Sequence, residues 1–293
     1  MSTLFKGSGV AIVTPFKDGS VDYTAFTRLI ELQIISGTDA IIVCGTTGEA
    51  ATLTPEERTE VIRFCVERVD GRVPVIAGSG SNNTAKAIEL SREAEALGVD
   101  GLLIVTPYYN KTSQAGLVAH YGAVCEQVHL PILVYNVPSR TGLNVLPATM
   151  QKIMGECENV VGIKEASGNI EQIVNLAALC PGLDIYSGND DHILPVLSVG
   201  GKGVISTIAN VAPSEVHNLC MAFFAGKLDI ARKLQFMLLP VWRAAFCETN
   251  PIPIKTMMHM MDLCGDELRL PLVPPQMENR ELMKKALKDF GLI

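Results

Sequence analysis

The sequence predicts a (β/α)8 barrel, also called a TIM barrel, followed by a C-terminal helical extension. Short runs rich in β-branched residues alternate with longer amphipathic stretches. The runs begin roughly 20 to 33 residues apart, the length of one βα unit. The chain has 293 residues, of which 48% are hydrophobic, and this is enough for one such barrel. The competing fold, a doubly wound open sheet, rarely reaches eight regular units, so we favour the closed barrel.

Eight strands and six intervening helices can be placed along the chain. The expected strands are Gly9–Val13, Ala40–Cys44, Val73–Gly78, Gly101–Thr106, Ile132–Asn136, Val160–Lys164, Asp184–Ser187 and Gly203–Thr207. The expected helices are Tyr23–Ser36, Pro55–Val69, Thr84–Leu97, Gln114–Val128, Leu146–Glu156 and Ile170–Leu179. Thr54 precedes a proline and two glutamates, which is typical of a helix start. Gly37 and Gly98 are typical helix ends.

The pattern changes after about Ala225, where no further strand is expected. Three helical stretches follow, at Lys227–Cys247, Asn250–Cys264 and Glu278–Phe290. We therefore divide the chain into a catalytic barrel at residues 1–225 and a three-helix extension at residues 226–293. We interpret the second part as a structural extension and not as a catalytic module.

Composition excludes several classes of function. The net charge is −7 and the isoelectric point is near 5.3, which argues against a nucleic-acid-binding face. No apolar run reaches the roughly 18 residues of a membrane span, and no signal peptide is expected. The eight cysteines form no CxxC pair and are interpreted as buried free thiols. We expect a soluble cytoplasmic protein.

Lys164 is the strongest catalytic candidate, because active sites of this fold collect at the carboxyl ends of strands. In the run from Val160 to Lys164, the period of two places Gly162 and Lys164 on one face. A lysine at a half-dry barrel mouth has its pKa lowered by desolvation, so its free amine can attack a ketone. Most lysines are solvated surface charges, but this one ends an apolar strand. Lys255 is a rival on a later helix.

An imine mechanism also requires a proton shuttle and a site for an anion. Tyr135 ends the neighbouring strand and is the expected shuttle, with Thr46 and Tyr109 as links in a relay. The turn containing Thr46 and Thr47 lies between glycines and offers amide and hydroxyl donors to a carboxylate. Arg140 offers a fork for a second carboxylate. The alternative for each of these is a buried side chain with satisfied hydrogen bonds or, for Arg140, a solvated one.

Other motifs carry little signal. Gly78-Ser79-Gly80 lacks the third glycine of a dinucleotide fingerprint, and there is no P-loop. The cluster from Asn189 to His192 is interpreted as a helix N-cap and not as a metal site.

Six stretches resemble the dihydrodipicolinate synthase family, and the likeness covers essentially the whole chain. They are GTTGEAATL from Gly45, PVIAGSGSNNT from Pro74, TPYYNKTSQ from Thr106, YNVPSRTG from Tyr135, GIKEASGN from Gly162 and ETNPIPIK from Glu248. The first stretch and the lysine are shared with the wider pyruvate-aldolase superfamily. The Tyr-Tyr-Asn turn together with Arg140 is the more specific combination.

The resemblance implies a reaction and a set of roles. Lys164 forms a Schiff base with pyruvate, and the enamine attacks L-aspartate 4-semialdehyde, which leads into the diaminopimelate route to lysine. The implied catalytic residues are Lys164, Tyr135, Thr46 and a Tyr109 lent by a neighbouring subunit, and the implied substrate-binding residues are Thr47, Arg140, Gly188 and the main chain of Ile205. No cofactor or metal is implied. The expected assembly is a homotetramer of two tight dimers.

Alternatives remain. An N-acetylneuraminate lyase or a 2-keto-3-deoxy sugar acid aldolase would keep Lys164 and Tyr135 without needing Arg140 or the Tyr109 relay. A non-catalytic ligand-sensing paralogue would be expected to have lost one of these groups. The resemblance also implies a cleft between subunits where L-lysine inhibits some members. There, histidines stand at the positions of Arg58 and Pro55 and a glutamate at that of Lys86, so we expect weak or no inhibition here.

Overall fold

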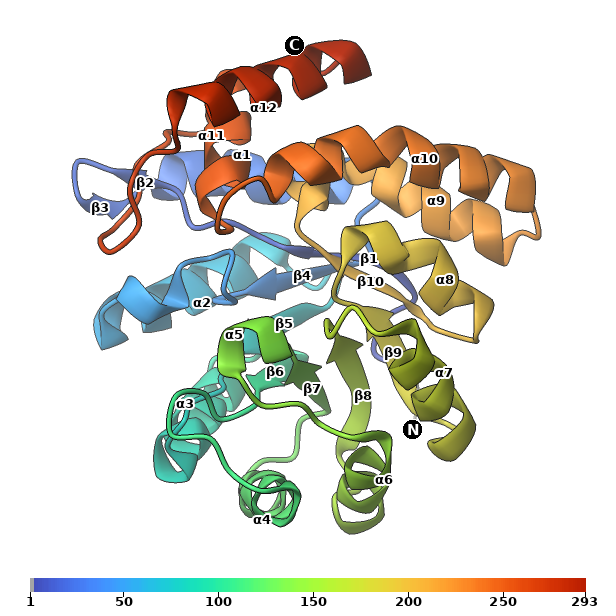
Figure 1. The fold of residues 1–293 in the computed structure, drawn as a ribbon. Coiled ribbons are helices and arrows are strands. Elements are labelled where there is room, and N and C mark those ends of the chain that lie inside the picture. Colours follow the sequence, from blue (N-terminus) through green and yellow to red (C-terminus); the bar gives the residue numbers. More distant parts are fainter. Residues whose placement is uncertain (1–2) are drawn as a thin grey trace.

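Eight parallel strands form a closed barrel in the computed structural model, which describes residues 3–293 (Figure 1). The strands are β1 (Gly7–Ala11), β4 (Ala40–Val43), β5 (Val75–Gly78), β6 (Gly101–Val105), β7 (Ile132–Asn136), β8 (Val160–Glu165), β9 (Asp184–Ser187) and β10 (Gly203–Ser206). Strand β1 pairs with both β4 and β10, which closes the ring. The predicted fold class is confirmed. The predicted first strand was placed two residues too late, because Gly7 already pairs with Gly203.

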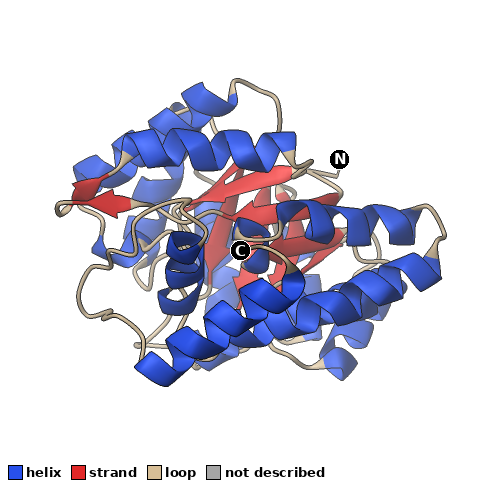
Figure 2. Ribbon diagram, turned by 90° about the horizontal axis from the view of Figure 1, so that it is seen from above, coloured by secondary structure: helices blue, strands red, loops and turns tan. Residues whose placement is uncertain are grey.

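Helices surround the barrel on all sides (Figure 2). They are α1 (Tyr23–Ile35), α2 (Pro55–Val69), α3 (Thr84–Ala96), α4 (Gln114–Cys125), α6 (Pro147–Glu156), α7 (Ile170–Leu179), α8 (Ile193–Ser198) and α9 (Pro213–Phe224). The start of α2 is a capping box, in which Thr54 and Glu57 bond to each other's backbone amides. This reciprocal arrangement satisfies two amides that a helix end otherwise leaves unpaired.

Several short elements were not predicted. They are the antiparallel pair β2 (Phe16–Lys17) and β3 (Ser20–Val21), the helix α5 (Pro138–Thr141), and the 3-10 turns η1 (Ala50–Thr52), η2 (Asp190–His192) and η3 (Ile208–Asn210). Elements of two to four residues are too short to show a hydrophobic period. All except the β2–β3 pair follow a barrel strand closely, so they build the rim at its carboxyl ends.

Side chains that alternate along the strands fill two separate apolar clusters. The inner cluster includes Ala11, Ile42, Ile76, Leu103, Leu133, Tyr186 and Ile205, and the outer one joins the strands to the helices. A Cβ atom added to Gly162 would lie 2.8 Å from Leu133 Cδ2, so Gly162 faces the barrel interior. Ile163 belongs to the outer cluster. The predicted orientation of Lys164, on the same face as Gly162, is therefore confirmed.

Three helices follow the barrel, as predicted: α10 (Leu228–Ala245), α11 (Ile252–Met260) and α12 (Met277–Phe290). Helix α10 packs against α9, and α12 packs against α10 and α11 (Figure 1, orange to red). The division at residue 225 stays a prediction. Within residues 3–293, no helix is both long and apolar enough to cross a membrane. All eight cysteines are free thiols, six of them buried.

Candidate active site

A cavity of about 570 Å³ opens at the carboxyl ends of the strands. Six of the eight residues predicted for the site line it: Thr46, Thr47, Tyr135, Arg140, Lys164 and Gly188. They come from β7 and β8 and from the loops that follow β4, β7 and β9. In barrel enzymes this face carries the chemistry, because every strand delivers the start of its loop to the same place.

Lys164 lies on β8 directly beside Tyr135 on β7. Its side chain is 6% exposed, and its Nζ atom lies 4.5 Å from the centre of the Tyr135 ring. Burial lowers the pKa of the Lys164 amine to about 8, while the charge of Asp190 opposes this shift and that of Arg140 adds to it. A substantial share of the amine is therefore unprotonated at mildly alkaline pH, which is what a carbonyl-attacking nucleophile requires.

Lys255, the rival lysine, has a different environment. Its side chain is fully buried, and its Nζ atom donates to Glu49 Oε1 at 2.6 Å and to the Glu267 carbonyl at 2.7 Å. The same atom lies 4.2 Å from the centre of the Phe16 ring. Since a buried ammonium paired with a carboxylate has no lone pair to offer, this lysine is suited to structure. Lys164 is the one whose amine reaches the cavity.

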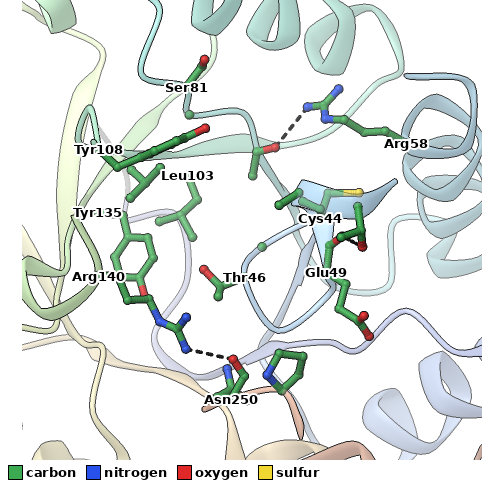
Figure 3. Close-up of a pocket in the computed structure, with 18 of the residues that line it drawn as sticks. Cys44, Thr46, Glu49, Arg58, Ser81, Leu103, Tyr108, Tyr135, Arg140 and Asn250 are labelled. Carbon is green, nitrogen blue, oxygen red and sulfur yellow. Dashed lines mark hydrogen bonds between the residues drawn. The ribbon is translucent and has the colours of Figure 1, made fainter. Parts of the chain in front are cut away.

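Tyr135 presents its hydroxyl to the cavity next to Thr46 and Arg140 (Figure 3). Burial raises the pKa of Tyr135, whereas the Arg140 charge and the Thr46 hydroxyl lower it. The phenol therefore stays protonated at neutral pH and can donate and accept a proton in turn. Tyr109, the other predicted link, is 91% exposed and does not line this cavity. A relay within one chain is thus incomplete.

The turn after β4 has unused amide groups. The amides of Gly48 and Glu49 donate to the carbonyls of Gly45 and Thr46 within the turn. Among the described residues, those of Thr46 and Thr47 have no hydrogen-bond acceptor. Adjacent amides with free N–H groups form a concave anion site, in agreement with the predicted binding of a carboxylate here.

Asn250 connects the two predicted carboxylate sites, and the sequence pattern did not reveal it. Its Nδ2 atom donates to Thr47 Oγ1 at 3.0 Å. Its carbonyl accepts from Arg140 Nη2 at 2.9 Å (Figure 3). Asn250 also lines the cavity. The C-terminal extension therefore contributes a residue to the wall of the site, although the sequence predicted only a structural role for it. The one available signal was its position in the ETNPIPIK stretch, to which no role had been given.

Of the two remaining predicted substrate contacts, Gly188 lines the cavity and Ile205 does not. A Cβ atom at Gly188 would approach the Ala166 Cβ to 2.5 Å, so only glycine fits where the Gly188 amide donates to the Glu165 carbonyl. The Ile205 side chain packs in the inner cluster, and Thr207 lines the cavity instead. The proposed contact of the Ile205 main chain with substrate stays a prediction.

The cluster from Asn189 to His192 does not cap its own helix as predicted. Asn189 makes no side-chain capping bond. The Asp190 carboxylate accepts instead from the amides of Thr207 and Ile208, at the start of η3. The sequence could not indicate this, because the amides that Asp190 caps lie in the loop after the next strand, β10. Within residues 3–293, no group of three or more His, Cys, Asp or Glu side chains is placed to hold a metal.

Comparison with known proteins agrees with this geometry. The family model of the dihydrodipicolinate synthetase family matches residues 4–290. The 4-hydroxy-tetrahydrodipicolinate synthase of Caldicellulosiruptor bescii is 56% identical, with 99% of this chain and 98% of that protein covered.

Two solved structures are also similar. The dihydrodipicolinate synthase of Thermotoga maritima has a TM-score of 0.98 at 45% identity, over 99% of this chain and 100% of that one. The chloride-inhibited dihydrodipicolinate synthase of Acinetobacter baumannii, complexed with pyruvate, has a TM-score of 0.96 at 43% identity, over 99% and 100%. The family model and these relatives match nearly the whole chain, and a buried lysine stands at the barrel mouth. The chain therefore belongs to the dihydrodipicolinate synthetase family.

Proposed function

We propose that the protein condenses pyruvate with L-aspartate 4-semialdehyde to give 4-hydroxy-tetrahydrodipicolinate, the step that leads into the diaminopimelate route to lysine. One observation carries this proposal. The amine of Lys164 is buried, has a lowered pKa and faces a cavity lined also by Thr46, Thr47 and Arg140, the groups expected to bind carboxylates. Pyruvate and the semialdehyde each bring one carboxylate, so the substrates and the cavity match in charge.

Each residue then has a defined task. The amine of Lys164 adds to the pyruvate ketone and a proton moves from nitrogen to oxygen. A second proton, delivered through Tyr135, then converts the hydroxyl group into the water that leaves, which gives an iminium. Tyr135 moves these protons and removes one from the pyruvate methyl group, forming the enamine. The enamine carbon attacks the aldehyde, and the amino group of the semialdehyde then closes the ring on the imine carbon and releases the lysine. The amides of Thr46 and Thr47 hold the pyruvate carboxylate, and Arg140 holds the other.

Two alternatives are less well supported. A neuraminate lyase or sugar acid aldolase would need hydroxyl-binding groups where Arg140 is held by Asn250. A ligand-sensing paralogue would not need a lysine whose pKa is lowered to about 8. Tyr109, exposed in one chain, would complete the relay in the site of a neighbouring copy, and we propose a homotetramer of tight dimers for this reason.

Reductive trapping tests the proposed chemistry. The protein is incubated with pyruvate, reduced with borohydride, digested and analysed by mass spectrometry. A pyruvyl adduct on the peptide that contains Lys164 is expected. An adduct on Lys255, or none, would show that the mechanism is wrong.

Arg140→Ala should impair use of the semialdehyde more than imine formation. Loss of a charged hydrogen-bond pair costs about 1.5–3 kcal/mol, so kcat/KM for the semialdehyde should fall roughly 10- to 150-fold. The Arg140 charge also lowers the pKa of Lys164, so trapping should be compared at pH 9, above that pKa. Arg140→Lys, which keeps the charge, is the matched control. Equal losses in both half-reactions would contradict the assigned role.

L-lysine should inhibit weakly or not at all. The expected inhibitor cleft adjoins the active site in a cavity of about 480 Å³ lined by Arg58, Lys86 and Tyr108 (Figure 3). Arg58 and Lys86 are each paired with a glutamate, Glu93 and Glu89 respectively, so neither offers a carboxylate to the ammonium groups of lysine. Each lost carboxylate contact or added like charge costs on the order of 1–3 kcal/mol when partly buried. Glu49 lines the same cavity but is already paired with Lys255.

The measurement is turnover against increasing L-lysine. Little change up to millimolar concentrations is expected, and Lys86→Glu should increase sensitivity by restoring a carboxylate. Strong inhibition of the unmodified protein by L-lysine at concentrations below about 1 mM would contradict this interpretation of the cleft.

A further inference from the structure

The carboxylate of Asp190 is buried and only half satisfied. Its Oδ2 atom accepts from the amides of Thr207 at 3.1 Å and Ile208 at 3.2 Å. Its Oδ1 atom is buried without a hydrogen-bond partner. Helix α10 also holds the segment from Asp190 to Leu194 in place, because Gln235 donates to the Asp190 carbonyl and accepts from the Leu194 amide. The carboxylate therefore has a fixed position and an unused oxygen.

Asp190 lies directly behind the wall of the active-site cavity. Its two preceding neighbours, Gly188 and Asn189, line this cavity together with Lys164, and so does its partner Thr207. Among residues 3–293, Lys164 forms no ion pair. The carboxylate thus acts on the amine without direct contact, and both side chains are buried. Between buried groups a charge acts more strongly than it does in water.

We propose that Asp190 is a positioning residue that acts through Lys164, as the fixed counter-charge for the iminium formed with pyruvate. This inference deepens the proposed function and rests on it. When the neutral amine adds to the ketone, one proton is taken up as water leaves, so the iminium nitrogen carries a positive charge that the neutral amine did not. A negative charge behind the wall favours that state over the neutral amine.

The charges around Lys164 agree with this role. Arg140 on α5 is the opposing cation, and Tyr135 on β7 contributes a neutral phenol. Burial raises the pKa of Asp190 to about 6, while the Ser206 hydroxyl, the amides of Ile208 and Thr207 and the charge of Lys164 oppose the shift. The carboxylate is consequently ionised at the pH where the Lys164 amine, with a pKa of about 8, becomes reactive.

The same charge should weaken the fold. Because the pKa of Asp190 is higher in the folded chain than in the unfolded one, the folded state binds the proton more tightly. Its relative stabilisation is present at acidic pH and is lost as the pH rises from about 4 to about 6. In the Asp190→Asn variant, the amide side chain carries no charge and keeps an acceptor for both backbone amides. Replacing the aspartate should therefore leave the melting temperature at pH 8 unchanged or raise it.

The test compares Asp190→Asn with Asp191→Asn, a matched loss of charge at the next position of the same turn, where Asp191 lies 3.7 Å from His192. Borohydride trapping is measured against pH and pyruvate concentration. In Asp190→Asn the acidic limb of the trapping rate should move to lower pH by on the order of one unit. The pyruvate concentration for half-maximal trapping at pH 8.5 should rise about tenfold. Asp191→Asn should change neither.

The outcomes separate this inference from the proposed function. An unmodified protein that forms no adduct would remove the proposed function itself. If the unmodified protein is trapped and Asp190→Asn gives the same pH limb and half-saturation, the counter-charge role is overturned. A uniform loss at every pH with a lower melting temperature, or failure to fold, overturns it as well, because both would point to a purely structural carboxylate.

Discussion

Lys164→Ala should abolish pyruvate trapping and reduce turnover to background. The reason is that the amine is the nucleophile, and among residues 3–293 no other lysine lines the cavity. The fold should persist, because this amine forms no direct ion pair among residues 3–293 and the Asp190 carboxylate keeps its hydrogen bonds to the amides of Thr207 and Ile208. The measurements are adduct mass after reduction, turnover, and melting temperature. Lys164→Met, which keeps more of the volume, should behave in the same way.

Lys255→Met is the informative contrast. It should still form the adduct, but it leaves Glu49 buried without its partner, and breaking such a pair costs about 3–5 kcal/mol. Lys164→Ala should thus lose adduct formation but keep its stability, and Lys255→Met should lose stability but keep adduct formation. Retained trapping in Lys164→Ala, or its loss in folded Lys255→Met, would reverse the assignment of the two lysines.

The barrel could be predicted because its signals are local. Each strand is a largely buried run of four to six residues with an apolar centre, and the start of α2 carries capping residues within one turn. The inward orientation of Lys164 followed from the period of two, since Gly162 lies two residues before it. Those parts of the site that lie at strand ends could be identified for the same reason.

The missed contacts join residues that are distant in sequence. Asn250 reaches Thr47 from 203 positions away, and Lys255 reaches Glu49 from 206. Asp190 caps a turn that follows the next strand. No periodicity within a segment reports such pairings, because they depend on how the extension packs on the barrel. A polar side chain in a helix N-cap pattern and one that caps a distant turn look the same in the sequence.

Glu165 illustrates the same limit beside the nucleophile itself. Its carboxylate accepts from Asn136, Ser167 and Gln172 and is almost fully buried. These bonds fix the end of β8 against β7 and α7. The sequence places Glu165 next to Lys164 but does not reveal that one residue faces the cavity and the other a buried polar network.

Tyr135→Phe should lower kcat by roughly 10²- to 10⁴-fold, the usual contribution of a positioned proton donor. The ring stays, so its packing against Lys164 and the melting temperature should be unchanged. Tyr109→Phe should produce a loss of similar size if this exposed tyrosine completes the relay. The measurements are kcat for the full reaction and the melting temperature. Full activity of Tyr135→Phe would contradict its role as the shuttle.

Mixing the two variants shows which chain supplies Tyr109. In a dimer of one Tyr109→Phe and one Tyr135→Phe subunit, exchange of Tyr109 between subunits leaves one site complete and the other without both hydroxyls. Half of randomly reassembled pairs are mixed and each has one working site of two, so about a quarter of the unmodified activity should return. If Tyr109 serves its own chain, every site lacks one hydroxyl and nothing returns. Unfolded and refolded single variants are the controls, and an absence of recovery after verified subunit exchange would exclude the shared relay.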